Sequence, residues 1–324
     1  MTLDRELRPD ALHGPADRQV SASPWGPEDE IGRLNWITPE SRAAVLARAD
    51  ATTMIDLSVD YFIGMPGFTA LGWPEYRIWM SATPEGGVVD DRTGFGRDVN
   101  SATPQAVDAI CLNTHSGTHI DALNHFGYGG RYWNGWTQDR HMGSRHWLKG
   151  GVDTYPPLVA RGVLLDVARL HGADELPDGH EIGVRELQAA AAQSGVEVRR
   201  GDIVLVRTGR MRRWPDQDRY VFGEAGAPGI GLAAARWLCE EAGAMVVGAD
   251  TTALECLPPR EPGQILPVHA YMLATAGAQI IEMVDLEELS QSGLGSFCLM
   301  GFMLRLRGAT ASPIRLAALG LRED

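Results

Sequence analysis

The sequence is poor in cysteine and has no closely spaced cysteine pair of the kind that metal or redox sites use. The four cysteines of the 324-residue chain lie far apart, at Cys111, Cys239, Cys256 and Cys298. We therefore expect free, buried thiols in a protein of a reducing compartment. The opening segment is charged and has no apolar core, so we expect no secretory signal and a cytoplasmic protein.

A long apolar run and an excess of positive charge are also missing. No uninterrupted apolar stretch approaches the ~20 residues that cross a bilayer, so no membrane-spanning helix is expected. Lysine and arginine number 29 against 42 aspartate and glutamate residues, which gives a formal net charge of −13. A chain this acidic is poorly suited to nucleic acid or to an anionic membrane surface, and we expect neither as a partner.

Motifs of two other common chemistries do not occur. The sequence has no GxSxG elbow, which disfavours a serine hydrolase. The glycine-rich stretch 226–231 lacks the spacing and the lysine of a phosphate-binding loop. We interpret it as a turn that leads into a helix.

The order of the apolar segments is typical of an α/β protein. Thr38-Pro39-Glu40 is a helix start, because threonine caps, proline tolerates the first helical position and an acid suits the helix dipole. Helices are predicted over 39–48, 184–194 and 232–242, and strands over 54–59, 76–82, 163–166, 203–207, 245–248, 278–283 and 298–306. Because strands alternate with helices from about residue 160, the pattern predicts a single domain with a mixed β-sheet flanked by helices.

Residues 1–37 are rich in Pro, Asp, Gly and Ser, and we interpret them as an N-terminal arm ahead of a domain over residues 38–324. Trp25 and Trp36 lie in this arm, and two tryptophans are rarely left exposed. They pack either on their own domain, or across a homo-oligomer (a dimer or higher) or over a neighbouring active site. The sequence leaves both alternatives open.

Five of the nine histidines fall between positions 115 and 146, and three of them are closely spaced. On extended backbone His119 and Asp121 point to the same face, and a kink at Gly117 would bring His115 round to join them. Two imidazoles and a carboxylate form a partial shell for a divalent metal and leave positions open for water. The alternative is a set of structural histidines, but three histidines and an aspartate around one glycine favour the metal.

This stretch resembles H-x-G-T-H-x-D-x-P-x-H, the signature of the cyclase-like metal-dependent hydrolases, which include bacterial kynurenine formamidase and isatin hydrolase. The matching residues are His115, Gly117, Thr118, His119, Asp121 and His125. The departure is Leu123, where the signature has a proline that would lock φ. Similar stretches at 25–26, 29–32, 207–209 and 247–251 extend the resemblance over roughly residues 25–305. It implies the swivelling β/β/α-like fold of that family.

The resemblance also implies roles for individual residues. His115, His119 and Asp121 would bind the metal, and His269 and Glu282 would complete a second metal site or support the first. His125 would lie near the substrate and move a proton. Zn and Mn suit imidazole and carboxylate ligands, in one ion or two, and Fe or Co would also fit. From the residues alone, Glu282 ends an apolar strand, where an unpaired carboxylate is costly.

An aromatic loop over residues 126–136 follows the histidines directly. Phe126, Tyr132 and Trp133 would form a wall for a flat aromatic or heterocyclic substrate. The alternative is that these rings pack on the sheet.

The combined interpretation is a metal-dependent hydrolase that cleaves a C–N bond in a small amide, formamide or lactam, with His125 as the proton shuttle. One alternative is a metal-dependent lyase or dehydratase-type cyclase acting on a small polyketide-like or hydroxy-acid substrate. A second is a metal-binding module without catalysis, which the position of His125 beside the ligands disfavours.

Overall fold

The computed structural model describes residues 20–322, and an eight-stranded mixed sheet organises them. The strand order is β1-β12-β11-β5-β7-β9-β10-β4, and β4 pairs with β12 as well, so that seven strands close into a barrel with β1 outside it. The strands are β1 (Ala49–Asp56), β4 (His119–Asp121), β5 (Leu158–Asp166), β7 (Ile203–Arg207), β9 (Val246–Ala249), β10 (Gln279–Glu282), β11 (Ser296–Met303) and β12 (Ala311–Leu321). Strands β5, β7, β9 and β10 run parallel, and the other neighbours in this sheet are antiparallel.

The predicted mixed sheet with flanking helices is confirmed, but the closed barrel was not predicted. Closure depends on β4, a strand of three residues that pairs on both sides. A strand this short leaves no periodicity in the sequence. The predicted strands over 163–166 and 54–59 begin five residues earlier, at residues 158 and 49, and the others are confirmed within three residues.

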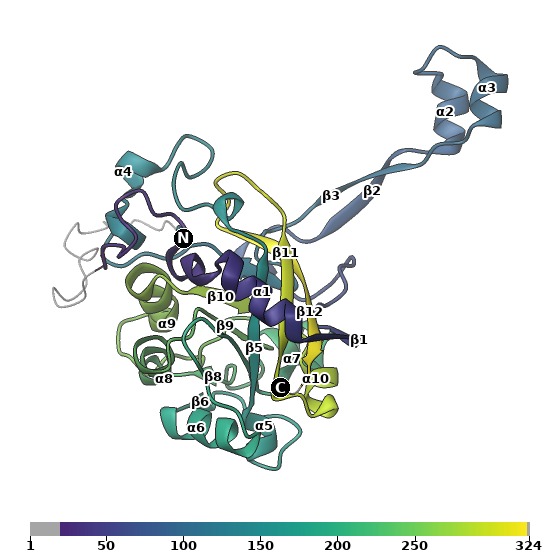
Figure 1. The fold of residues 1–324 in the computed structure, drawn as a ribbon. Coiled ribbons are helices and arrows are strands. Elements are labelled where there is room, and N and C mark those ends of the chain that lie inside the picture. The colour runs from purple at the N-terminus through teal and green to yellow at the C-terminus, as the bar shows by residue number, and fades with distance from the viewer. Residues whose placement is uncertain (1–19, 323–324) are drawn as a thin grey trace.

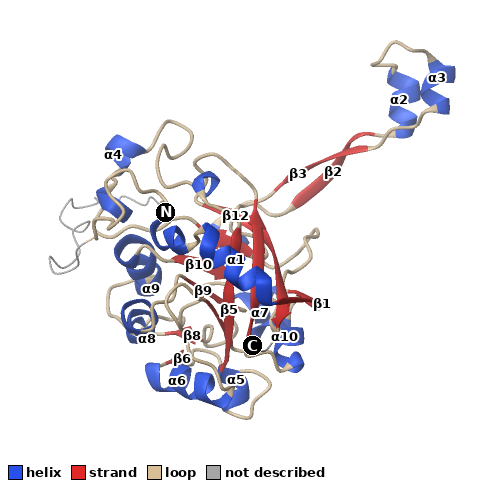
Figure 2. Cartoon of the chain, viewed as in Figure 1, coloured by secondary structure: helices blue, strands red, loops and turns tan. Residues whose placement is uncertain are grey.

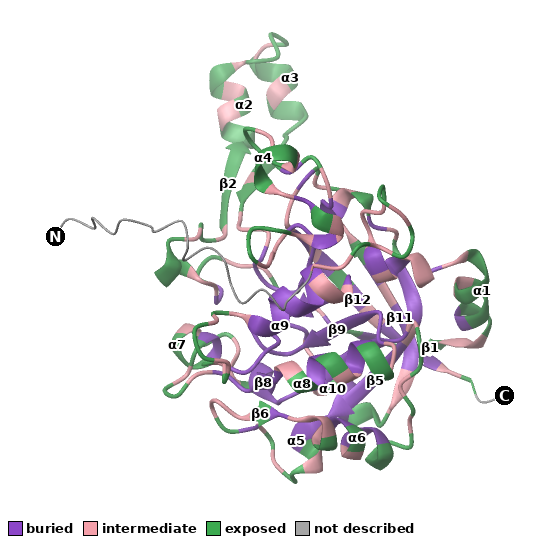
Figure 3. Cartoon of the chain, turned by 90° about the vertical axis from the view of Figure 1, so that its left-hand side faces the viewer, coloured by how far each residue is buried: buried purple, intermediate pink, exposed green. Residues whose placement is uncertain are grey.

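Alternation along the parallel strands separates two hydrophobic cores. Leu164 and Leu205 belong to the core that fills the barrel. Val163 and Val204, one residue earlier on each strand, belong to the core between the barrel and the helices. Because successive side chains of a strand point to opposite faces, the continuous apolar strands fill both layers. Figure 3 shows these strands as the buried centre of the molecule.

Helices flank the barrel, as Figure 2 shows. The main ones are α1 (Pro39–Arg48), α5 (Val167–Leu170), α6 (Val184–Gln193), α7 (Gln217–Val221), α8 (Leu232–Arg236), α9 (Pro267–His269) and α10 (Glu287–Ser292), with α4 (Gln138–His141) in an outer loop. Helix α1 has the predicted bounds, and Thr38 caps it by accepting the N–H of Ser41. The predicted helix 232–242 divides into α8 and a π-helical turn, Trp237–Glu241. Within residues 20–322, no helix combines the length and apolar character needed to cross a bilayer.

The described part of the N-terminal arm packs on its own chain. Trp25 and Trp36 meet edge to face with ring centroids 5.9 Å apart. The carboxylate of Asp29 accepts the indole N–H of Trp133 at 3.1 Å. Residues 20–37 therefore make contacts with their own domain, packing across a homo-oligomer stays a prediction, and residues 1–19 of the predicted arm lie outside the described residues.

A long hairpin projects from the body (Figure 1). It consists of β2 (Arg77–Ala82) and β3 (Val107–Cys111), and it carries α2 (Pro84–Asp90) and α3 (Arg97–Ala102) at its tip. The prediction of four buried thiols is wrong at Cys111, because a lone two-stranded ribbon leaves both faces open to solvent. The other three cysteines are buried, and all four are free. A further pair of short parallel strands, β6 (Glu181–Ile182) and β8 (Gly229–Ile230), lies beside the helices.

Candidate metal centre

A turn at Gly117 builds the first part of the site. Gly117 has φ +58°, and a Cβ there would lie 2.6 Å from the ring of Tyr61. The Tyr61 hydroxyl lies 2.6 Å from the carbonyl oxygen of Ser116 and 2.9 Å from that of Thr118, and the one O–H proton shared between them holds the turn in place. The chain reverses as expected and brings Nδ1 of His115 to 2.9 Å from Oδ1 of Asp121.

Strand β4 places His119 and Asp121 on one face and Ile120 on the other. Ile120 joins the core inside the barrel, so the two polar side chains point away from it. Strand β10 pairs with β4 in a register that sets Glu282 opposite His119, and His119 Nε2 lies 3.2 Å from Glu282 Oε2. The pairing therefore joins the histidine motif to a carboxylate far along the chain.

His269, the last residue of α9, completes the cluster. Its Nε2 lies 3.1 Å from Glu282 Oε1 and 3.7 Å from Asp121 Oδ2. The structure thus brings together all five predicted metal-binding residues, and each is buried: His115, His119, Asp121, His269 and Glu282.

His125 lies in the same cluster, more exposed than its neighbours. Its Nε2 is 3.9 Å from Asp121 Oδ2, and its ring centroid is 4.0 Å from that of His115. Ligand atoms of His115, Asp121 and His125 all lie within 4.8 Å of one another, and the same holds for His119, Asp121 and Glu282. Asp121 is shared by both sets, so the geometry has room for one ion or two.

The polar atoms of the cluster test whether a metal fits. His119 Nε2, both carboxylate oxygens of Asp121 and Glu282 Oε1 are buried and have no hydrogen-bond partner among residues 20–322. His119 Nδ1 donates to the Gly117 carbonyl at 2.8 Å, so Nε2 is the ring nitrogen that faces the carboxylates and is placed to bind a metal once its proton is displaced. Lone pairs facing one another in a dry site are costly, and a divalent cation satisfies all of them. The donor set fits Zn or Mn.

Two imidazoles of the cluster are oriented by contacts to the ring nitrogen that faces away from the ligand set. Neither contact was predicted from the sequence. Glu255 Oε1 lies 2.7 Å from His269 Nδ1, and Thr310 Oγ1 lies 3.0 Å from His115 Nε2. Such contacts fix the tautomer of a metal-binding histidine. Glu255 is an acidic residue between the apolar Leu254 and Cys256, and this pattern in the sequence could have indicated a buried carboxylate with a partner. Nothing in the sequence marks Thr310.

The local environment also sets the protonation of the cluster. Burial, followed by the neighbouring imidazole, lowers the pKa of both His115 and His125 to about 3. Burial acts to raise the pKa of Glu282, but the imidazoles of His119 and His269 outweigh it and lower the value to about 2. Two imidazoles are therefore neutral at pH 7, the form that binds a metal or accepts a proton.

The predicted substrate residues divide between the site and the core. Phe126 lies beside the cluster, with its ring centroid 5.2 Å from that of His125 and 5.5 Å from that of His269. Tyr132 packs edge to face on Trp147 at 4.5 Å and is partly buried. Trp133 is 2% exposed and belongs to the hydrophobic core, which agrees with the alternative that the rings of this loop pack inside the protein. Trp73, at the base of the projecting hairpin, was not singled out in the sequence, yet its ring centroid lies 5.9 Å from that of His115.

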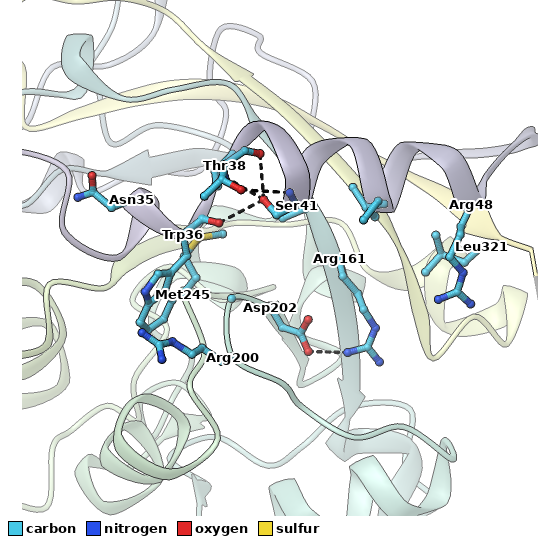
Figure 4. A pocket seen from close by; sticks show the side chains of 15 residues that line it. Asn35, Trp36, Thr38, Ser41, Arg48, Arg161, Arg200, Asp202, Met245 and Leu321 are labelled. Atoms are coloured by element: carbon cyan, nitrogen blue, oxygen red, sulfur yellow. Dashed lines mark hydrogen bonds and ion pairs between the residues drawn. The ribbon is translucent and has the colours of Figure 1, made fainter. Parts of the chain in front are cut away.

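A pocket of about 480 Å³ lies elsewhere, below α1 (Figure 4). Trp36, Arg161, Asp202 and Met245 line it, and Asp202 and Met245 directly precede β7 and β9. Glu282 is the last residue of the parallel strand β10, so the histidine cluster lies at the opposite end of the barrel. The pocket and the cluster are therefore separate.

Comparisons with known proteins agree on one family. A family model described as Putative cyclase matches residues 55–256. Cyclase-like protein 3 of Oryza sativa subsp. japonica is 24% identical over 267 residues, which are 81% of this chain and 78% of that protein. A crystal structure described as a novel cyclase superposes with a TM-score of 0.77 at 30% identity, covering 91% of this chain and 97% of the other. Isatin hydrolase A from Ralstonia solanacearum shares the fold, with a TM-score of 0.61 at 22% identity over 88% and 98% of the two chains.

Proposed function

Because this chain belongs to the cyclase family, whose model spans residues 55–256, we propose that it is a metal-dependent hydrolase of a C–N bond in a small amide, formamide or lactam. The observation that carries the proposal is the set of buried, unpartnered nitrogen and oxygen atoms on His119, Asp121 and Glu282. A purely structural cluster would pair these atoms with one another.

Zn or Mn, as one ion or two, would be held by His115, His119, Asp121, His269 and Glu282. A divalent ion polarises a carbonyl group and lowers the pKa of water from ~15.7 to about 7. Asp121 would connect the two halves of the ligand set, because its Oδ1 lies beside His115 Nδ1 and its Oδ2 lies nearer to His269 Nε2.

His125 is the proposed proton carrier. Burial lowers the pKa of its imidazole, which keeps the ring unprotonated before the reaction but makes it a weak base, so the neighbouring carboxylate of Asp121 would have to support its uptake of a proton from water. It then gives that proton to the leaving nitrogen. The charge of Asp121, 3.9 Å from Nε2, stabilises the imidazolium between the two transfers.

The proposed substrate is a small, flat molecule. Phe126 contacts the rings of both His125 and His269, and it would offer an apolar surface at the reacting group. Tyr132 is proposed to line the outer part of the same wall. The fold shared with isatin hydrolase A, whose name refers to a lactam, supports this class.

Cyclisation with loss of water is the second candidate. The family description and the structure described as a novel cyclase favour it. Product mass separates the two reactions, because hydrolysis adds one water and dehydrating cyclisation removes one.

We also propose a homo-oligomer in the cytoplasm. Exposed apolar side chains on the projecting hairpin, Ile78, Trp79, Met80 and Ile110, support self-association. Free, mostly buried thiols support a reducing compartment.

The test is metal content by plasma mass spectrometry on wild type and His119→Ala, with turnover of N-formylkynurenine and of isatin followed on the same samples. We expect wild type to carry about one or two equivalents of Zn or Mn, and the variant to lose metal and turnover together. Wild type that binds no divalent metal after reconstitution would overturn the proposal.

A further inference from the structure

A second group of metal-ligand side chains lies on the surface where α5 meets α6, away from the histidine cluster. His171 Nε2 and His180 Nε2 lie 2.7 Å and 2.8 Å from the same oxygen, Oε1 of Glu186. The two imidazole centroids are 5.5 Å apart, and the three ligand atoms lie within 4.8 Å of one another. We propose that His171, His180 and Glu186 form a second metal site, which takes one transition-metal dication such as Zn²⁺.

The local backbone holds each of the three residues in place. Glu186 is the third residue of α6, and its Oε2 accepts the N–H of Gly183 at 2.9 Å, which leaves Oε1 for the histidines. The N–H of His171 donates to the last turn of α5, and the N–H of His180 donates to the Pro177 carbonyl. Anchored ligands lose little freedom when an ion binds.

The spacing of the ligand atoms suits zinc after a small adjustment. With metal–ligand bonds of about 2.0–2.1 Å in a tetrahedron, ligand atoms lie about 3.3 Å apart. The present separations of 2.7 Å and 2.8 Å would open by about 0.6 Å, which small side-chain rotations provide. The side chains of His171, His180 and Glu186 are 43%, 27% and 23% exposed, so an ion can reach them and keep water as a fourth ligand.

Protons compete with the ion at this site. In the metal-free protein each Nε2–H donates to Glu186 Oε1. A bound ion would replace both hydrogen bonds: a neutral ring would move its proton from Nε2 to Nδ1, and a cationic ring, already protonated at Nδ1, would release its Nε2 proton to solvent. Binding therefore weakens as pH falls.

An ion at this site would restrict the motion of a segment that is connected to the histidine cluster. It would cross-link His171 and Glu186, the two ends of the segment 171–186. The carbonyl of His180 accepts the N–H of Gly229, at the start of the β6–β8 pairing. Ile230 of β8 then forms a β-bridge with Glu255, the carboxylate that holds His269. The β6–β8 pair thus connects the proposed second site to Glu255, which orients His269 in the histidine cluster.

The test titrates Zn²⁺ against a chromogenic chelator, using protein already saturated at the histidine cluster. Wild type is compared with His171→Gln and with His146→Gln, a control histidine that is exposed in a loop. We expect wild type and His146→Gln to bind one further equivalent, and His171→Gln to bind it at least about tenfold more weakly. Crystals soaked in Zn²⁺ should show an anomalous peak between His171 and His180.

Two outcomes would overturn the proposal. One is equal affinity for the further equivalent in all three proteins, and the other is the same loss in His146→Gln as in His171→Gln. Circular dichroism checks that His171→Gln is folded, and if it is not, His180→Gln takes its place with the same expected loss.

Discussion

Glu255 holds His269 by its Nδ1 nitrogen, with Glu255 Oε1 2.7 Å away and only 1% of the acid exposed. The same carboxylate accepts the backbone N–H groups of Val268 and His269, so both of its oxygens are engaged. The imidazole is thereby fixed with Nε2 facing Asp121 and Glu282. A loop that follows β9 thus orients a ligand on α9.

Replacing this carboxylate should weaken the metal site. We expect Glu255→Gln to lower metal affinity about 10–100-fold, because an amide has one accepting end and cannot serve all three N–H donors. Competition with a chelator measures the affinity. Glu240→Gln is the matched control, since Glu240 accepts the Tyr271 hydroxyl and is 55% exposed. Unchanged affinity in Glu255→Gln would show that this contact does not orient a metal ligand.

Replacing His125 should reduce turnover without releasing the metal, whereas replacing a metal ligand should reduce both. We expect His125→Ala to keep its metal and to lose about 10²–10⁴-fold in kcat, since it removes a proton carrier. His119→Ala, assayed beside it, should lose metal and turnover together. Metal content and kcat are measured on the same preparations. Metal loss in His125→Ala would instead make His125 a ligand and rule out the shuttle.

Leu123 stands where the family signature has proline, and the structure shows what its N–H does. It donates to the Tyr155 hydroxyl at 2.9 Å, inside the core. We expect Tyr155→Phe to cost about 1–3 kcal/mol in the free energy of unfolding, because a buried N–H loses its partner. Proline needs no such partner, so Leu123→Pro should cost less in the Tyr155→Phe background than in wild type. Denaturant unfolding of the four proteins measures this, and additive costs would contradict it.

Asp202 should make stability depend on pH. Burial raises the pKa of Asp202 from 3.8 to about 6, although the Arg199 N–H and the Arg161 guanidinium act against it. The folded carboxyl therefore holds its proton more tightly than the unfolded one. The stability this contributes is present below about pH 4 and is lost as pH rises through about 6.

The variant Asp202→Asn, which cannot titrate at this position, separates the contribution of Asp202 from the rest of the pH dependence. Between about pH 4.5 and about pH 7.5, wild type should lose about 2 kcal/mol of unfolding free energy relative to Asp202→Asn. Urea unfolding at the two pH values measures both proteins. A difference that does not change with pH would mean that Asp202 titrates alike in the folded and unfolded chains.

Short-range patterns in the sequence predicted the local structure well. Thr38-Pro39-Glu40 predicted the start of α1, because a cap and a first-turn proline act within one helical turn. The spacing of His119 and Asp121 predicted a shared face, because side chains alternate along a strand. Position 123 shows the limit of such patterns, since the partner of its N–H is Tyr155, which no spacing rule connects to it.

The sequence by itself determined the α/β class, the first and last residues of α1 and the core of the histidine motif, because each depends on residues within a few positions of one another. Only the tertiary structure decided the closure of the barrel through β4, the burial of Trp133 and the support of His269 by Glu255. These features depend on pairings between distant segments. The β4–β10 register, which sets Glu282 against His119, is formed by hydrogen bonds that any backbone could make. Which strands meet is decided by how the whole chain packs its two cores.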